Sequence, residues 1–246
     1  MSKSFRLSSL LCVLVFALSL SLGAGLASAT PISIVNVPDD IYAVTTNTGG
    51  VYAFNPGTYT ATDTAVTDYS GSTPVVSSGN FPGSLSVGDG VDLTATGTSG
   101  SYPVYNAGLA LQTGSFFQTG GAITAQGVNG GSGIELLPGA FTQSGGAITA
   151  TGNGFSSTGI YLDSGDFTQS GGAITATGNS GTGIFLGTGA FTQEGGFISA
   201  EAFNNGHGIY LDSGALTQGP GGVLRLLPGD GSGNAVDVMN FTASGK

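Results

Sequence analysis

The feature that most constrains this chain is a sequence repeat of about 25 residues. The tetrapeptide GGAI stands at 120–123, 145–148 and 171–174, and it returns in altered form at 195–198 and 221–224. Two further elements keep the same spacing: Gly-Ile/Leu-x-Leu, starting at Gly108, Gly133, Gly159, Gly183 and Gly208, and Phe/Leu-x-Gln, ending at Gln118, Gln143, Gln169, Gln193 and Gln218. A repeat of this length predicts a stack of equivalent units that share one continuous core.

Each unit reads as three short β-strands separated by glycine-bearing turns. Within a strand the residues alternate, so that Ile134 and Leu136 face the core and Glu135 faces outward. Gly-Gly pairs recur too often for helices. The pattern predicts an all-β fold, a right-handed parallel β-helix with three-strand coils of about 25 residues. Its hand follows from the crossover preference of parallel strands.

Stacked coils bring equivalent residues together at the strand spacing of about 4.8 Å. We expect an internal phenylalanine stack, an internal isoleucine column and a ladder of glutamine amides that bond their neighbours above and below. The phenylalanines are Phe116, Phe141, Phe167 and Phe191, the isoleucines are Ile123, Ile148, Ile174 and Ile198, and the glutamines run from Gln118 to Gln218.

Residues 1–29 predict a secretory signal peptide. Lys3 and Arg6 precede an apolar stretch, and Ala-Ser-Ala at 27–29 is a small-x-small cleavage site. The one cysteine, Cys12, lies within this stretch, so the exported chain has no disulfide. We therefore expect a protein that is secreted or held at the cell surface.

Export leaves two basic and fourteen acidic residues, a net charge of −12. A surface of this charge repels nucleic acid and anionic lipid headgroups. Nucleic acid is therefore excluded as a partner.

The repeat does not cover the whole chain. Residues 30–90 fit it poorly, and we expect them to form an irregular N-terminal cap or first coils. Leu93–Gly97 resembles Ile148–Gly152 and predicts a degenerate coil, so the β-helix is expected over 91–246. Val236-x-Val238 begins a further unit that the sequence does not finish. We expect this domain to be truncated at its C-terminal end, which implies end-to-end association or a longer parent chain.

Few residues are candidates for catalysis. Gly206-His207-Gly208 is similar to the G-H-G tripeptide of polygalacturonases, which are β-helix enzymes. Those enzymes also need clustered Asp residues, whereas Asp39-Asp40 lies outside the repeat and Arg225-Leu226-Leu227 is a poor match to their R-I-K segment. His207 occupies a variable loop position, filled by Ser132, Thr158 and Thr182 in other coils. We predict no catalytic residue.

The carboxylates do not suggest a metal site. Asp163 and Asp212 are equivalent turn residues, but Gly187 separates them in the coil between, a spacing of about 10 Å. Calcium binds its oxygen ligands at about 2.3–2.6 Å, so these two cannot share one ion. Asp166 and Glu194 sit at different places in their coils and suggest no acid–base pair. We predict no metal and no cofactor.

The outward position of the Gly-Ile-x-Leu strand suggests a binding surface. It reads Ala110, Glu135, Tyr161, Phe185, Tyr210 and Asp237. Tyr161, Phe185 and Tyr210 should form a stripe of three aromatic rings on one face. Such a stripe could stack on sugar rings or dock a partner. Alternatively, the rings stack on each other and only stabilise the sheet.

The repeat resembles the passenger regions of Gram-negative autotransporters and related polymorphic outer-membrane adhesins. The likeness covers about 100–245 and rests on the GGAI copies, the Gly/Ser/Thr/Asn-rich coils, the signal peptide and the cysteine-free mature chain. Two features depart from that class: F-T-Q replaces the F-x-x-N motif of the polymorphic proteins, and the translocator barrel is missing. The resemblance implies an extracellular adhesive or scaffolding role without a cofactor.

We therefore expect a non-catalytic, secreted or surface-displayed β-solenoid, adhesin-like or structural, with a host or cell-surface glycan or protein as its partner. Two alternatives stay open. One is a polysaccharide-degrading β-helix enzyme similar to pectin lyases or polygalacturonases, and the other is a truncated or self-associating structural remnant.

Overall fold

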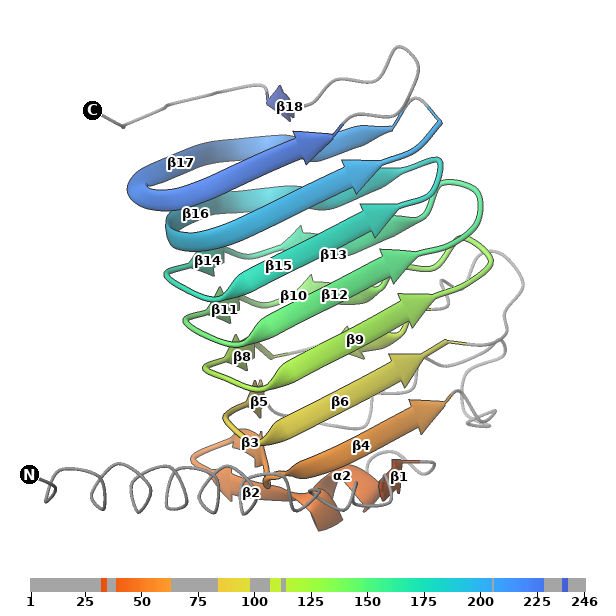
Figure 1. The fold of residues 1–246 in the computed structure, drawn as a ribbon, viewed down its shortest axis with the longest axis vertical. Coiled ribbons are helices and arrows are strands. Elements are labelled where there is room, and N and C mark those ends of the chain that lie inside the picture. The colour runs from red at the N-terminus through yellow and green to blue at the C-terminus, as the bar shows by residue number, and fades with distance from the viewer. Residues whose placement is uncertain are drawn as a thin grey trace, which may run out of the picture. The chain divides into compact units, whose positions relative to one another are not determined.

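The computed structural model describes residues 32–34, 39–62, 84–97, 107–111, 114–204, 206–227 and 236–238 (Figure 1). The predicted signal peptide at 1–29 lies outside the described residues. The described part of the chain is almost entirely β-structure, with one short helix, α2 (Asp39–Val44).

The strands form three parallel sheets, which we call sheets A, B and C in the order in which each coil visits them. Sheet A contains β7 (Leu109–Leu111), β10 (Ile134–Pro138), β13 (Thr158–Ser164), the first parts of β16 (Thr182–Ala202) and β17 (His207–Leu227), and β18 (Val236–Val238). Sheet B contains β3 (Val51–Phe54), β5 (Ser84–Val87), β8 (Phe116–Gln118), β11 (Phe141–Gln143), β14 (Phe167–Gln169) and the middle parts of β16 and β17. Sheet C contains β1 (Ile32–Ile34), β4 (Gly57–Thr62), β6 (Val91–Thr96), β9 (Ala122–Gly127), β12 (Ala147–Gly152), β15 (Ala173–Gly178) and the last parts of β16 and β17.

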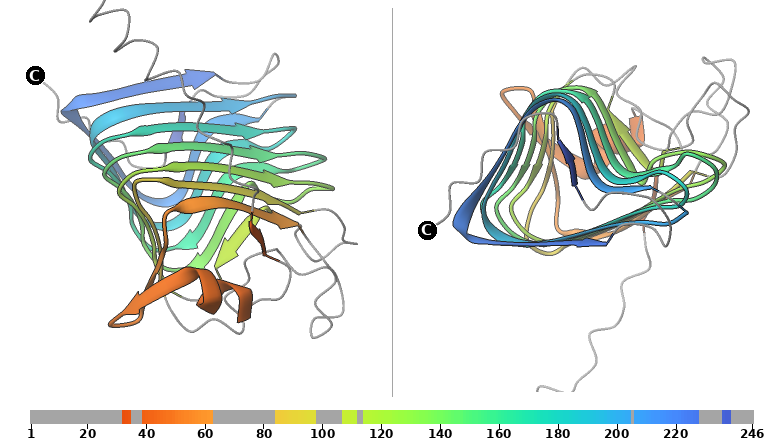
Figure 2. Two further views of the ribbon diagram at one scale, coloured as in Figure 1. Left: turned by 60° about the horizontal axis from the view of Figure 1, so that its bottom comes forward. Right: turned by 90° about the horizontal axis from the view of Figure 1, so that it is seen from above.

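The coil is right-handed. In Figure 1 the chain climbs from β4 to β17 while the strands in front run from left to right and those behind return. Figure 2 shows the same coils along their axis, where the three sheets enclose one core. The predicted all-β, right-handed parallel β-helix is confirmed.

The register follows the sequence repeat. Ile148 pairs with Ile123 on one side and with Ile174 on the other, and Phe141 pairs with Phe116 and Phe167. The degenerate coil is confirmed too, because Leu93 pairs with Ile123 in sheet C. Parallel strands related by one repeat place identical side chains directly over each other, so the core consists of columns of like residues.

The internal phenylalanine stack forms as predicted. Ring centroids of Phe141 and Phe167 are 4.7 Å apart with planes at 3°, and those of Phe167 and Phe191 are 4.4 Å apart at 5°. Phe116 continues the stack at 5.4 Å from Phe141. All four rings are buried, so the stack combines hydrophobic burial with ring–ring contact.

The glutamine ladder forms beside this stack. The amide nitrogen of Gln143 donates to the side-chain oxygen of Gln118 at 2.9 Å, and Gln169 donates to Gln143 at 2.8 Å. Gln193 and Gln218 repeat the bond to the coil before them at 3.0 and 3.5 Å. These amides satisfy one another in an interior where an unpaired polar group is costly.

The first coils are covered by α2 and by an antiparallel hairpin. Ile41 of α2 is buried in the core together with Phe54 and Tyr59. β2 (Thr45–Thr48) pairs with β3 in antiparallel fashion, and β3 then joins sheet B. The antiparallel strand breaks the parallel stacking on this side, while residues 63–83 lie outside the described residues.

The corner between sheets A and B requires glycine. Gly165 has a φ of +125°, and a Cβ built there would lie 2.1 Å from the backbone oxygen of Gly139 one coil below. Gly189 repeats the geometry over Gly165. The backbones at this corner stack without room for a side chain, which explains why this glycine recurs in the repeat.

Candidate functional site

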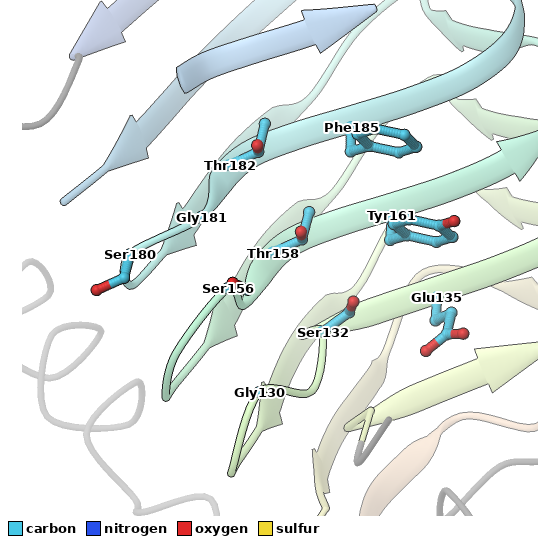
Figure 3. Close-up of a pocket in the computed structure, with 10 residues that line it drawn as sticks. All are labelled: Gly130, Ser132, Glu135, Ser156, Thr158, Tyr161, Ser180, Gly181, Thr182 and Phe185. Atoms are coloured by element: carbon cyan, nitrogen blue, oxygen red, sulfur yellow. The ribbon is translucent and has the colours of Figure 1, made fainter. Parts of the chain in front are cut away.

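The outer face of sheet A carries a cavity of about 280 Å³ that spans three coils (Figure 3). It lies between the sheet and the loops that lead from sheet C into sheet A. Its lining residues are Gly130, Ser132, Glu135, Ser156, Thr158, Tyr161, Ser180, Gly181, Thr182 and Phe185. The volume lies near the lower end of the range of small-molecule sites, about 300–1,000 Å³.

The repeat builds this cavity by supplying the same positions from each coil. The residue just before the Gly-Ile-x-Leu glycine is Ser132, Thr158 or Thr182 in the three coils that line the cavity, so each of these three rungs carries a hydroxyl. Thr158 and Thr182 are paired in the sheet A ladder, which stacks their side chains. The next coil places His207 in the same column, in register with Thr182.

The three hydroxyls have no hydrogen-bonding partner within the described part of the chain. Ser132 is 5% exposed, and Thr158 and Thr182 are each 9% exposed, yet all three line the cavity. Although the residues are largely buried, their hydroxyl oxygens are open to the cavity. These side chains therefore present donors and acceptors to whatever fills the cavity.

The predicted aromatic stripe forms, and two of its rings, Tyr161 and Phe185, line the cavity. The ring centroids of Tyr161 and Phe185 are 4.8 Å apart at 3°, and those of Phe185 and Tyr210 are 5.5 Å apart at 9°. Because the rings stack face to face, Phe185 has both faces occupied and presents its edge outward. On its other side, the ladder partner of Tyr161 is Glu135. The binding role of the stripe stays a prediction.

Glu135 is the one acidic residue in the cavity lining, and the sequence did not suggest its burial. It occupies the outward position below Tyr161 in the ladder, but only 8% of it is exposed. Burial, and to a lesser degree the negative charge of Asp163, raises the pKa of this carboxyl to about 7. The signal that could have indicated this site is a carboxylate placed between Ala110 and the aromatic rings of Tyr161 and Phe185 in the same column.

An exposed aromatic residue lies on the loop that forms the outer wall. Phe155 is 86% exposed and directly precedes Ser156, which lines the cavity. A single exposed Phe on a loop exposes apolar area without forming a patch. No feature of the sequence repeat marks this residue.

The other candidate residues do not form a site. Asp163 and Asp212 were expected in turns, but they lie in strands β13 and β17, where they are exposed and accept bonds from the hydroxyls of Tyr161 and Tyr210, both at 3.4 Å. The carboxylate of Asp166 accepts the backbone N–H of Ala190 at 2.9 Å, a turn-stabilising role.

His207 packs its ring 5.3 Å from that of Tyr210 at the end of the hydroxyl column. Asp39 and Asp40 belong to α2, and Arg225 is exposed on sheet C. Among the described residues, no three His, Cys, Asp or Glu side chains are grouped as a metal site would need.

Comparison with protein-family models, with curated proteins and with solved structures found no match to this chain. The fold is that of a β-helix repeat protein. No helix in the described ranges is both long enough and apolar enough to cross a membrane.

Proposed function

We propose that this chain is a non-catalytic, secreted or surface-displayed β-solenoid that binds an extracellular partner through the outer face of sheet A. The observation that carries the proposal is the cavity, where three hydroxyls without a partner in the described part of the chain adjoin the rings of Tyr161 and Phe185. Aromatic surface next to a few fixed polar groups is the usual composition of a binding site.

The resemblance to autotransporter passengers and polymorphic outer-membrane adhesins supports the adhesive reading. A rigid stack of coils positions equivalent groups at regular intervals, which suits a surface that holds a partner rather than one that transforms it. Export through a signal peptide at 1–29 belongs to the same proposal. The partner would be a glycan or protein of a host or of a neighbouring cell surface.

The test is binding by the purified exported chain to a glycan array and to a panel of purified extracellular-matrix proteins. Phe185→Ala should reduce binding at least fivefold, because it removes the middle ring of the stripe. Phe197→Ala is the matched control, since Phe197 faces outward on sheet C and lies outside the cavity lining. Equal loss in both variants, or no retention by either panel, would contradict the proposed function.

A polysaccharide-degrading enzyme is the second candidate, and one observation favours it. Glu135 has a pKa of about 7, the range of a general acid, and interacts with the charge of Asp163. Glycosidases use two carboxyl groups across the scissile bond, but Asp163 lies outside the cavity lining and accepts a bond from Tyr161. Release of reducing ends from neutral glycans by wild type, abolished in Glu135→Gln, would support this candidate over the first.

A further inference from the structure

The cavity on sheet A contains a carboxyl group that the described part of the chain leaves without a partner. Glu135 lines the cavity, and only 8% of this residue is exposed. Among the described residues, no donor forms a hydrogen bond or an ion pair with its carboxyl, and the carboxyl oxygens are open to the cavity. A carboxylate held out of bulk water is stable only when a cation or hydrogen-bond donors pair with it. Glu135 is therefore available to a partner from outside the chain.

The neighbours of Glu135 in the stack carry no positive charge. On the coil above, Tyr161 is its ladder partner, and the negative charge of Asp163 acts on the carboxyl. On the coil below, its ladder partner is Ala110, which does not ionise. The site thus concentrates negative charge, and a cation is the kind of group that it attracts.

The nearest basic side chains of the described residues lie elsewhere. Arg225 is the one Lys or Arg in this part of the chain, and it lies on sheet C. His207 lies on the third coil above Glu135, about 14 Å along the stack at the strand spacing. The formal net charge of the whole chain is −10. A cation is therefore drawn to this face, whereas an anion would meet negative charge without a counter-ion.

The hydroxyls give the cavity a second kind of contact. Figure 3 shows Ser132, Thr158 and Thr182 in one column on sheet A, with Glu135 in a second column beside it. Ser132 and Glu135 are three residues apart in the chain, at most about 11 Å. A ligand that contacts both columns has a cationic group at one end and hydrogen-bonding groups at the other.

A lysine residue of another protein has this form. Its ammonium is a compact charge with three N–H donors at the end of a flexible four-carbon stem. Its main-chain N–H and C=O, at the other end of the stem, can donate to hydroxyls and accept from them. Phe185 lines the cavity with the edge of its ring. The methylene groups of the stem can pack on this apolar edge, as long cationic side chains do on protein surfaces.

We propose that the cavity receives a lysine side chain of the protein partner, with its ammonium against the carboxylate of Glu135 and its main-chain groups against the hydroxyls of Ser132 and Thr158. This inference rests on the proposed binding function and names the chemistry by which the site recognises a protein. The fold already holds the carboxyl out of bulk water, so pairing with the ammonium requires little further desolvation of Glu135.

A proton competes with the ammonium for Glu135. Burial, and to a lesser degree Asp163, raises the pKa of this carboxyl to about 7. The carboxyl must lose its proton before it can pair with a cation, whereas a lysine ammonium, with an ordinary pKa of about 10.4, stays charged throughout this range. Binding should therefore strengthen as pH rises through 7, with a Kd about tenfold lower at pH 8 than at pH 6.

The experiment titrates the purified exported chain with small probes and follows ligand NMR saturation transfer at pH 6 and pH 8. Nα-acetyl-lysine methylamide should bind at pH 8. Nα,Nε-diacetyl-lysine methylamide keeps the main-chain groups but lacks the charge, and it should bind at least about tenfold more weakly. Ethanolamine and glucosamine present the ammonium of a lipid headgroup and of an amino sugar without the four-carbon stem. Both should also bind at least about tenfold more weakly.

Variants then locate the binding. Glu135→Gln removes the charge at nearly constant shape, so it should raise Kd at pH 8 at least about tenfold and abolish the difference between pH 6 and pH 8. Glu194→Gln is the matched control, because it removes one negative charge at an exposed position and should change neither quantity. Thr158→Val removes one hydroxyl and should raise Kd about two- to tenfold at both pH values. Thr149→Val, an exposed position on sheet C, should leave Kd unchanged.

Three results would overturn the inference: the lysine probe does not bind, a probe without the charge or the stem binds as tightly, or the Glu135 variant behaves like the Glu194 variant. The proposed function is tested separately, by Phe185-dependent binding to a matrix protein before and after acetylation of its lysines. If acetylation does not change that binding, or if only glycans bind, the lysine inference fails and the proposed function stands. If no partner binds at all, both fail.

Discussion

The side-chain amide of Gln143 donates to the side-chain oxygen of Gln118 on the adjacent coil, at 2.9 Å and inside the core. Its second N–H points to the backbone oxygen of Ala173 in the following coil, at 3.2 Å. Gln169 and Gln193 repeat both bonds. Each glutamine therefore ties three consecutive coils together, and the amides all point the same way along the stack.

Removing one amide should destabilise the stack strongly. Gln169→Ala leaves the oxygen of Gln143, an N–H of Gln193 and the backbone oxygen of Phe197 without their partner. We expect the free energy of unfolding to fall by about 2–4 kcal/mol. Urea denaturation followed by far-UV circular dichroism is suitable, because the chain has no tryptophan.

Gln126→Ala is the control for this experiment. Gln126 is exposed on sheet C, so its loss should change stability by less than about 0.5 kcal/mol. Similar midpoints for the Gln126 and Gln169 variants would mean that the ladder contributes little beyond packing.

The internal phenylalanine stack should matter far more to stability than aromatic residues outside the core. Phe167→Ala opens a void between Phe141 and Phe191 and should cost about 3–5 kcal/mol. Phe155→Ala should cost less than about 0.5 kcal/mol, because that ring is almost fully exposed. The ranking is checked by thermal unfolding of both variants beside wild type, and it is wrong if the two melt together.

The glycine corner between sheets A and B should tolerate no side chain. Gly165→Ala places a Cβ against the backbone oxygen of Gly139 and also strains a positive φ, so we expect a loss of at least about 3 kcal/mol. Gly49→Ala is the control, since Gly49 also has positive φ but has nothing within 4 Å of the added carbon. Strain alone should cost that variant about 1–2 kcal/mol, measured by the same denaturation. Equal costs would show that the close approach of the backbones is unimportant.

Glu135 should make stability depend on pH in a defined window. The pKa of this carboxyl is raised from 4.5 to about 7 in the fold. The stabilising contribution of Glu135 to the free energy of unfolding is therefore fully present below pH 4.5. It declines as pH rises from 4.5 to 7 and does not change further above that range. The shift corresponds to about 3 kcal/mol.

Glu135→Gln should remove this decline. We expect the variant to gain about 3 kcal/mol relative to wild type between pH 4.5 and 7.5, as measured by urea denaturation at several pH values. Glu194→Gln is the control, because Glu194 is exposed, and its curve should run parallel to that of wild type. Parallel curves for the Glu135 variant would show that the carboxyl is not held in its proton-bearing form.

The core could be predicted from the sequence because a stack of parallel coils is specified by two patterns alone, the repeat and the alternation within each strand. Once the repeat fixes which residues are equivalent, period two decides which of them face inward, as Phe141 and Gln143 do. Register and burial then follow without any knowledge of distant parts of the chain. The aromatic stripe of Tyr161, Phe185 and Tyr210 could be located for the same reason.

The cavity could not be predicted in this way. It depends on how far the loops before Ser132, Thr158 and Thr182 stand away from the sheet, and these loops differ in length and composition. The burial of Glu135 depends on the volume of neighbouring side chains and not on the alternation that placed it outside. Strand patterns describe two faces of a sheet, and they contain no information about what lies on top of one.

The uniform direction of the glutamine ladder has a consequence for how the gene of such a protein can evolve. Gln143, Gln169 and Gln193 each donate to the glutamine of the coil before and accept from the glutamine of the coil after, so these neighbouring coils are interchangeable. Duplicating or deleting one whole repeat in the gene would join like to like and leave every kind of internal bond intact. Recombination can therefore change the number of coils more easily than any other feature of this protein. A single-residue insertion, in contrast, would disturb all three sheets at once.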